Sequence, residues 1–113
     1  MIKSLVNHFE KFSQWIYNKY SNVSLKIVEI GCNDGVLLHP LKKLGYKNLI
    51  GIDPSQTIKK IDSDIITYND YFADNIVDDI LIQLSCAFVT IITSPKFIRC
   101  LNNSCNSISK VLK

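Results

Sequence analysis

The sequence lacks long apolar runs and is poor in several residue types that carry particular functions. Its 113 residues include four glycines and a single arginine against twelve lysines. No apolar stretch reaches the ~18–20 residues that cross a bilayer. Lys3, Glu10, Lys11 and Lys19 also interrupt the N-terminal region, so it does not read as a signal peptide. We therefore expect a cytoplasmic protein that makes no contact with a membrane.

The scarcity of arginine and the spacing of the cysteines exclude two further classes of site. Arg99 is the only arginine, the residue whose bidentate contacts most often recognise bases, and the lysines are scattered, which argues against nucleic-acid binding. The four cysteines contain no C-x-x-C pair, and the C-x4-C at Cys100 and Cys105 has no matching half. We therefore expect no metal site, and free thiols in a reducing compartment.

The N-terminal residues 1–24 are predicted to form an amphipathic helix and its connection to one larger domain. Apolar residues recur at spacings of three and four within residues 3–20, namely Leu5, Phe9, Phe12, Ile16 and Tyr20. Such a stripe indicates a helix that docks on the rest of the chain. With 47% apolar residues, the chain suits a single domain with one core.

From residue 25 onward, short apolar strands alternate with helical patterns. We expect strands at 26–30, 48–52, 65–68 and 87–93, and helical segments at 36–44, 55–60, 71–84 and from Asn102 or Asn103 onward. Pro40 fits only the first turn of its helix. This alternation predicts an α/β fold with a Rossmann-like parallel sheet of about four strands and flanking helices. The doubly wound arrangement would order the strands 3-2-1-4.

Two strand ends carry the residues that indicate chemistry. Gly31 and Gly35 follow the first strand, and Asp53 ends the second. Ligands of parallel sheets bind beyond the carboxyl ends of the strands. Glycines let the backbone approach such a ligand, and a carboxylate can accept hydrogen bonds from both hydroxyls of a ribose. The sequence therefore predicts a nucleoside site.

The loop after the first strand selects among nucleoside ligands. Asn33 and Val36 stand where a G-x-G-x-x-G dinucleotide fingerprint requires glycine, and Glu29 and Asp34 would repel a pyrophosphate. This disfavours a dinucleotide oxidoreductase. The carboxylates suit a ligand with a cationic amino group and no phosphate. S-adenosylmethionine, with its adenosine, sulfonium and amino-acid end, matches that description.

The two motifs also resemble a known family. E-I-G-C-N-D-G-V-L-L at 29–38 and L-I-G-I-D-P-S at 49–55 resemble class I S-adenosylmethionine-dependent methyltransferases. They are most similar to the family that C-methylates nucleotide-linked deoxysugars. The resemblance covers roughly residues 25–113 and implies an incomplete class I methyltransferase fold with a partial S-adenosylmethionine-binding domain. It also implies a small-molecule acceptor, a nucleotide-linked sugar in that family.

The resemblance assigns roles to residues at the ends of the four strands. At the methionine end of the cofactor it implies a pocket shaped by Glu29, Gly31 and Gly35 and lined by Cys32, Asn33 and Asp34. Asp53 would hold the ribose, with Pro54 and Ser55 beside the adenine. Asp70 or its neighbour Asn69 would approach the adenine amino group. Thr93 and Ser94 would lie near the position of methyl transfer.

The departures from the family leave the catalytic residues unassigned. No cysteine cluster precedes residue 26, Arg99 stands where a histidine is expected, and no residue is a credible base for a carbon acceptor. The sequence thus resembles the cofactor-binding half of a methyltransferase. Two interpretations stay open: a methyltransferase, or a non-catalytic remnant or half-domain that needs a partner chain. The apolar fourth strand at 87–93 would present a bare edge, to which a second copy or a partner chain could pair.

Overall fold

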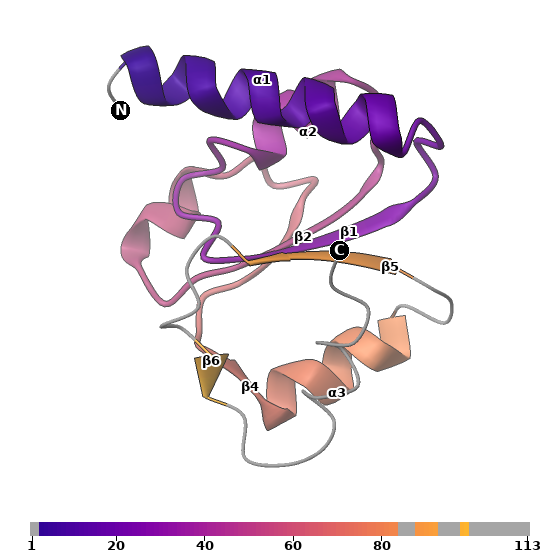
Figure 1. Ribbon diagram of the computed structural model, residues 1–113. Helices are drawn as coiled ribbons and strands as arrows, with labels where there is room; N and C mark the ends of the chain where they lie inside the picture. Colours follow the sequence, from indigo (N-terminus) through magenta and orange to yellow (C-terminus); the bar gives the residue numbers. More distant parts are fainter. Residues whose placement is uncertain (1–2, 84–87, 93–97, 100–113) are drawn as a thin grey trace.

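The computed structural model describes residues 3–83, 88–92 and 98–99. Its elements alternate as the sequence predicts (Figure 1). In chain order they are α1 (Lys3–Lys19), β1 (Lys26–Ile30), α2 (Leu38–Lys43), β2 (Asn48–Ile52), the 3-10 helix η1 (Gln56–Lys60), β3 (Ile66–Tyr68), β4 (Phe72–Ala73), α3 (Asp74–Gln83), β5 (Phe88–Ile92) and β6 (Ile98–Arg99).

An open parallel sheet forms the centre of the molecule. The strands follow the order β3-β2-β1-β5, and β1 pairs in parallel with β2 on one side and with β5 on the other. Figure 1 shows α1 and α2 over one face of this sheet and α3 over the other. The expected α/β class, with a parallel sheet and flanking helices, is confirmed.

The core lies between the sheet and the helices α1 and α2. Four of the five residues in β1 and four of the five in β2 are buried, which is typical of strands covered on both faces. Leu38 and Leu41 of α2 and Ile16 of α1 pack into the same cluster. The Tyr46 hydroxyl donates a hydrogen bond to the carbonyl of Tyr20, and this bond ties the end of α1 to the segment after α2.

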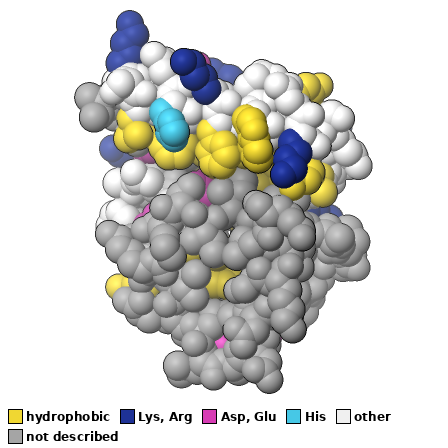
Figure 2. Space-filling view, viewed as in Figure 1, with side chains coloured by type: hydrophobic (Ala, Val, Ile, Leu, Met, Phe, Trp, Pro, Cys, Tyr) yellow, Lys and Arg dark blue, Asp and Glu magenta, His cyan; other side chains and the backbone are white. Residues whose placement is uncertain are grey.

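Helix α1 buries one face and leaves large apolar groups on another. Phe9, Phe12 and Tyr20 pack against the core beside buried Ile16, as the predicted stripe requires, whereas Leu5 is 37% exposed. Trp15 is 54% exposed, and the ammonium of Lys19 lies 5.1 Å from its ring centroid. Figure 2 shows hydrophobic side chains along this helix on the viewed face. Among the described residues, no helix combines the length and apolarity that crossing a membrane requires.

Two helical predictions differ from the structure. The pattern at 71–84 predicted one helix, but Phe72–Ala73 form strand β4, which pairs in parallel with β6, and α3 begins only at Asp74. The helix predicted at 36–44 is confined to Leu38–Lys43, with Pro40 in its first turn as expected. Leu84, Thr93 and the helix expected from Asn102 or Asn103 lie outside the described residues.

Candidate functional site

The loop that joins β1 to α2 makes the tight turn that its glycines predict. Gly31, Asn33 and Gly35 have positive φ angles of 87°, 54° and 89°. The backbone N–H of Gly31 donates to the carbonyl of Ile52 over 2.7 Å, so the loop starts against the end of β2. A Cβ at Gly35 would also lie 2.9 Å from Cε1 of His39. Glycine at 35 therefore serves both the backbone conformation and the packing of His39.

Asp53 connects the two sequence motifs. The backbone N–H of Asn33 donates to Asp53 Oδ2 over 2.9 Å, and the backbone N–H of Ser55 donates to Asp53 Oδ1 over 2.7 Å. Only 2% of Asp53 is exposed. A carboxylate offers about four acceptor positions, so about two remain on this side chain. Its carboxylate thus holds the loop after β1 against the loop after β2.

The two residues after β3 are both exposed, but only Asn69 bonds to the loop after β2. Asn69 donates from Nδ2 to the backbone carbonyls of Asp53 and Ser55, each over 3.0 Å. Asp70 is exposed, and its Oδ1 accepts a hydrogen bond from the backbone N–H of Tyr71 over 2.7 Å. Of the two candidates for contact with the adenine, Asn69 therefore lies in the bonded cluster at the ends of the strands, and Asp70 does not.

Hydroxyl groups extend this cluster to the start of η1. Ser55 is the N-cap of η1, and its Oγ accepts a hydrogen bond from the backbone N–H of Thr57 over 3.3 Å. The Thr57 hydroxyl donates to Oδ1 of Asn33 over 2.6 Å. This link from η1 back to the loop after β1 was not predicted from the sequence, because nothing local relates Thr57 to Asn33. Pro54 lies between these contacts and is partly buried.

Two residues expected around the methionine end are buried in the protein interior. Glu29 in β1 is 1% exposed, and Cys32 is fully buried in the hydrophobic core. Burial raises the pKa of the Cys32 thiol, and the nearby carboxylates of Glu29 and Asp53 raise it further. A Cβ at Gly51 would come within 2.7 Å of Cys32 Sγ. Cys32 is therefore a neutral packing residue held close to the glycine of β2.

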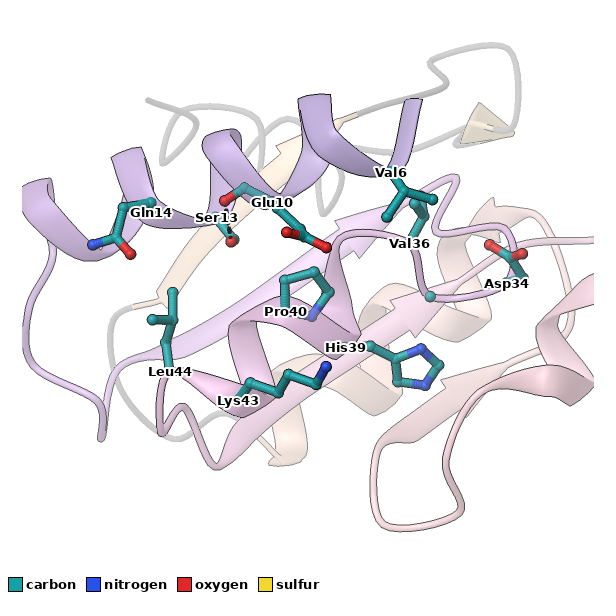
Figure 3. Close-up of a pocket in the computed structure, with 11 residues that line it drawn as sticks. Val6, Glu10, Ser13, Gln14, Asp34, Val36, His39, Pro40, Lys43 and Leu44 are labelled. Atoms are coloured by element: carbon teal, nitrogen blue, oxygen red, sulfur yellow. Dashed lines mark hydrogen bonds between the residues drawn. The ribbon is translucent and has the colours of Figure 1, made fainter. Parts of the chain in front are cut away.

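A pocket of about 460 Å³ lies between α1 and residues 34–44, which include α2 (Figure 3). Of the predicted site residues, only Asp34 and Gly35 line it. Asp34 Oδ1 is enclosed and accepts no hydrogen bond from any described residue. The remaining lining residues are Val6, Glu10, Ser13, Gln14, Val36, His39, Pro40, Lys43 and Leu44. Sequence reasoning missed this pocket, since four of its eleven lining residues come from α1, a helix outside both motifs.

The structure therefore brings most of the predicted residues together at the carboxyl ends of the parallel strands. The loop from Gly31 to Gly35 meets Asp53 and Ser55 there, while Thr93 lies outside the described residues. Within the described ranges, no three His, Cys, Asp or Glu side chains gather as metal ligands would. No protein-family model matches this chain, and no curated protein matches it.

Proposed function

We propose that this chain binds S-adenosylmethionine as the cofactor-binding part of a methyltransferase of the C-methyltransferase type. The observation that carries the proposal is the hydrogen bond from the Asn33 backbone N–H to Asp53 Oδ2, at 2.9 Å. It joins the two motifs that resemble the family into a single cluster at the carboxyl ends of adjacent parallel strands, where ligands of such sheets bind. The proposal includes the class I strand order 3-2-1-4, with β5 as the fourth strand.

The residues fit the two ends of the cofactor to different degrees. Oδ1 of Asp34 is enclosed, so it accepts a hydrogen bond from the cationic amino group only if the Asp34 side chain turns outward. Asp53 keeps about two acceptor positions for ribose hydroxyls. Because only 2% of Asp53 is exposed, a ribose reaches these positions only if the segment around Pro54 or the loop at Asn33 moves aside.

The bound cofactor would supply an electrophilic methyl group on its sulfonium. The task of the chain's own residues is then to bind and orient the cofactor, which is where much of the rate gain in such a transfer arises. The resemblance proposes a small-molecule acceptor, a nucleotide-linked sugar. Transfer to carbon also requires removal of a proton, and we assign no residue to that step.

The outer side of strand β5, at the end of the sheet order, leads to a proposal about partners. β5 pairs with β1 on one side and with no described strand on the other. We propose that this edge pairs with a second copy of the chain or with a separate chain that completes the sheet. Light scattering after size-exclusion chromatography is expected to show a dimer that forms with rising concentration. A monomer at all concentrations, in the absence of any partner, would contradict pairing with a second copy.

One observation favours a second candidate function, a non-catalytic domain. Both oxygens of Asp53 already accept backbone hydrogen bonds, so this residue has a complete structural role without any ligand. In a non-catalytic remnant the same contacts would persist, and the loops would bind no nucleoside.

Calorimetric titration with S-adenosylhomocysteine separates the two candidates. We expect micromolar binding if the chain holds the cofactor. The ribose contact is tested by changing the ligand, because substitution of Asp53 would also disturb the loops. Analogues of S-adenosylhomocysteine that lack the 2′- or the 3′-hydroxyl are expected to bind about tenfold more weakly or worse, the loss of one charge-assisted hydrogen bond. No heat from a sample that is folded by circular dichroism would favour the non-catalytic domain.

A further inference from the structure

The pocket between α1 and α2 combines an apolar surface with charged side chains of both signs. Val6 from α1 and Val36, Pro40 and Leu44 from the segment around α2 contribute the aliphatic part of its lining. Charged side chains surround that surface. Figure 3 shows Glu10 above Pro40, with Asp34 near Val36 and Lys43 beneath.

The charges in this pocket lack partners within the described part of the chain. Glu10 and Lys43 are exposed and form no ion pair with a described residue, and the enclosed Oδ1 of Asp34 accepts no hydrogen bond from one. Nε2 of His39 accepts a hydrogen bond from the backbone N–H of Asp62 over 3.2 Å and lies 3.6 Å from Asp62 Oδ1, so this ring nitrogen is already engaged by Asp62. The pocket therefore offers two carboxylates and one ammonium group.

We propose that this pocket is a binding site for a small zwitterion with an aliphatic body. Its ammonium group would meet Asp34 and Glu10, its carboxylate would meet Lys43, and its body would cover Val36 and Pro40. Asp34 precedes α2 and Lys43 ends it, so the two charges of the ligand have to be held apart. The enclosed Oδ1 of Asp34 has no donor among the described residues, which is costly, and a turn of this side chain into the pocket would let a ligand ammonium remove that cost.

The charge balance argues against two simpler ligands and against a nucleotide. An aliphatic amine would satisfy Asp34 but leave Lys43 without a partner. An aliphatic acid would satisfy Lys43 but would face Glu10 and Asp34, which repel it. A nucleoside diphosphate is disfavoured for the same reason. The site shares Asp34 with the proposed cofactor site, but its α1 residues lie outside the region of resemblance, so it can take a ligand even if the chain holds no cofactor.

Titration with 6-aminohexanoate, followed by backbone amide shifts, tests this proposal. We expect saturable shifts at residues of the pocket, including Glu10 and Gly35. Hexylamine and hexanoate each lack one charge and are expected to bind about tenfold more weakly or worse. Glycine, whose two charges are adjacent, is expected to bind as weakly as they do.

Matched variants connect the binding to particular side chains. Asp34→Asn and Lys43→Met are each expected to weaken the binding of 6-aminohexanoate by about tenfold or more. Lys43→Arg is expected to retain binding. Lys47→Met removes another exposed lysine that lies outside the pocket and is expected to bind as the parent does. Lys43 is exposed, so its variants test the site even if Asp34→Asn disturbs the loop.

Several results would overturn the proposal. These are the absence of saturable shifts, equal binding of hexylamine or hexanoate, and an unchanged affinity in Lys43→Met. Binding of 6-aminohexanoate without any binding of S-adenosylhomocysteine would refute the proposed cofactor function and leave this site standing.

Discussion

Replacement of Gly51 by alanine tests the packing on which the candidate site depends. A methyl group at this position of β2 would lie 2.7 Å from Cys32 Sγ and 2.7 Å from Leu38 Cδ1, well inside ordinary contact distance. Cys32 and Leu38 are fully buried. β2 is also held between β1 and β3, so neither the strand nor its neighbours can retreat freely.

The expected cost follows from these two short contacts. Overpacking a core by one methyl group costs about 1–3 kcal/mol, and two simultaneous clashes place Gly51→Ala toward the upper end, at about 2–3 kcal/mol. In urea, a slope of about 1–3 kcal/mol per molar means that this loss lowers the unfolding midpoint by roughly 0.7–3 M. Equilibrium unfolding followed by far-ultraviolet circular dichroism measures that shift.

A double variant shows whether the clash with Cys32 is the cause. Cys32→Ala removes Sγ and so leaves room for the new methyl group, although Leu38 still crowds it. Gly51→Ala with Cys32→Ala is therefore expected to lose less stability than the sum of the two single variants, by about 0.5 kcal/mol or more. A loss below about 0.5 kcal/mol in Gly51→Ala, or additive effects in the double variant, would refute the packing argument.

Two further predictions concern the anchor of the β2 loop and the buried thiol. Asn69→Ala removes two hydrogen bonds to backbone carbonyls and is expected to cost about 1–2 kcal/mol in urea unfolding, whereas Asp70→Ala is expected to change the midpoint little. Because burial raises the pKa of Cys32 above its ordinary value of 9.0, the unfolded chain loses this proton before the folded chain does. The free energy of unfolding should therefore fall above about pH 9 by up to about 1.4 kcal/mol per pH unit, and this part of the slope should be absent in Cys32→Ala. Tyr46, whose pKa burial also raises, adds to the fall only at higher pH, above its ordinary value of 10.0, and does so in both proteins. An equal slope in both proteins, or an equal loss in the Asn69 and Asp70 variants, would contradict these assignments.

The parts of the fold that the sequence predicted are those with a local pattern. The bounds of β1 and β2 match because each is a short, nearly continuous apolar strand, buried by neighbours on both sides. Pro40 correctly limited α2, since its ring excludes all but the first turn. β4 could not be predicted, because Phe72 pairs with Ile98, far along the chain, and its spacing to Ile76 also suits a helix.

The candidate site was predictable in its residues but not in its contacts. The strand ends identified the Gly31–Gly35 loop and Asp53, yet not that the Asp53 carboxylate is enclosed by two backbone donors. That arrangement depends on how two loops meet. Likewise, the roles of Asn69 and of the α1–α2 pocket depend on elements that are distant in sequence and adjacent only in the folded chain.

Amide chemical shifts during titration with S-adenosylhomocysteine test whether the two motifs bind the cofactor. We expect saturable shifts at Asn33, Asp53 and Ser55, where the two motifs meet, and none in α3, which covers the face of the sheet opposite α1 and α2. A folded protein whose amides at these positions do not respond would contradict the claim. Shifts confined to other parts of the chain would contradict it equally.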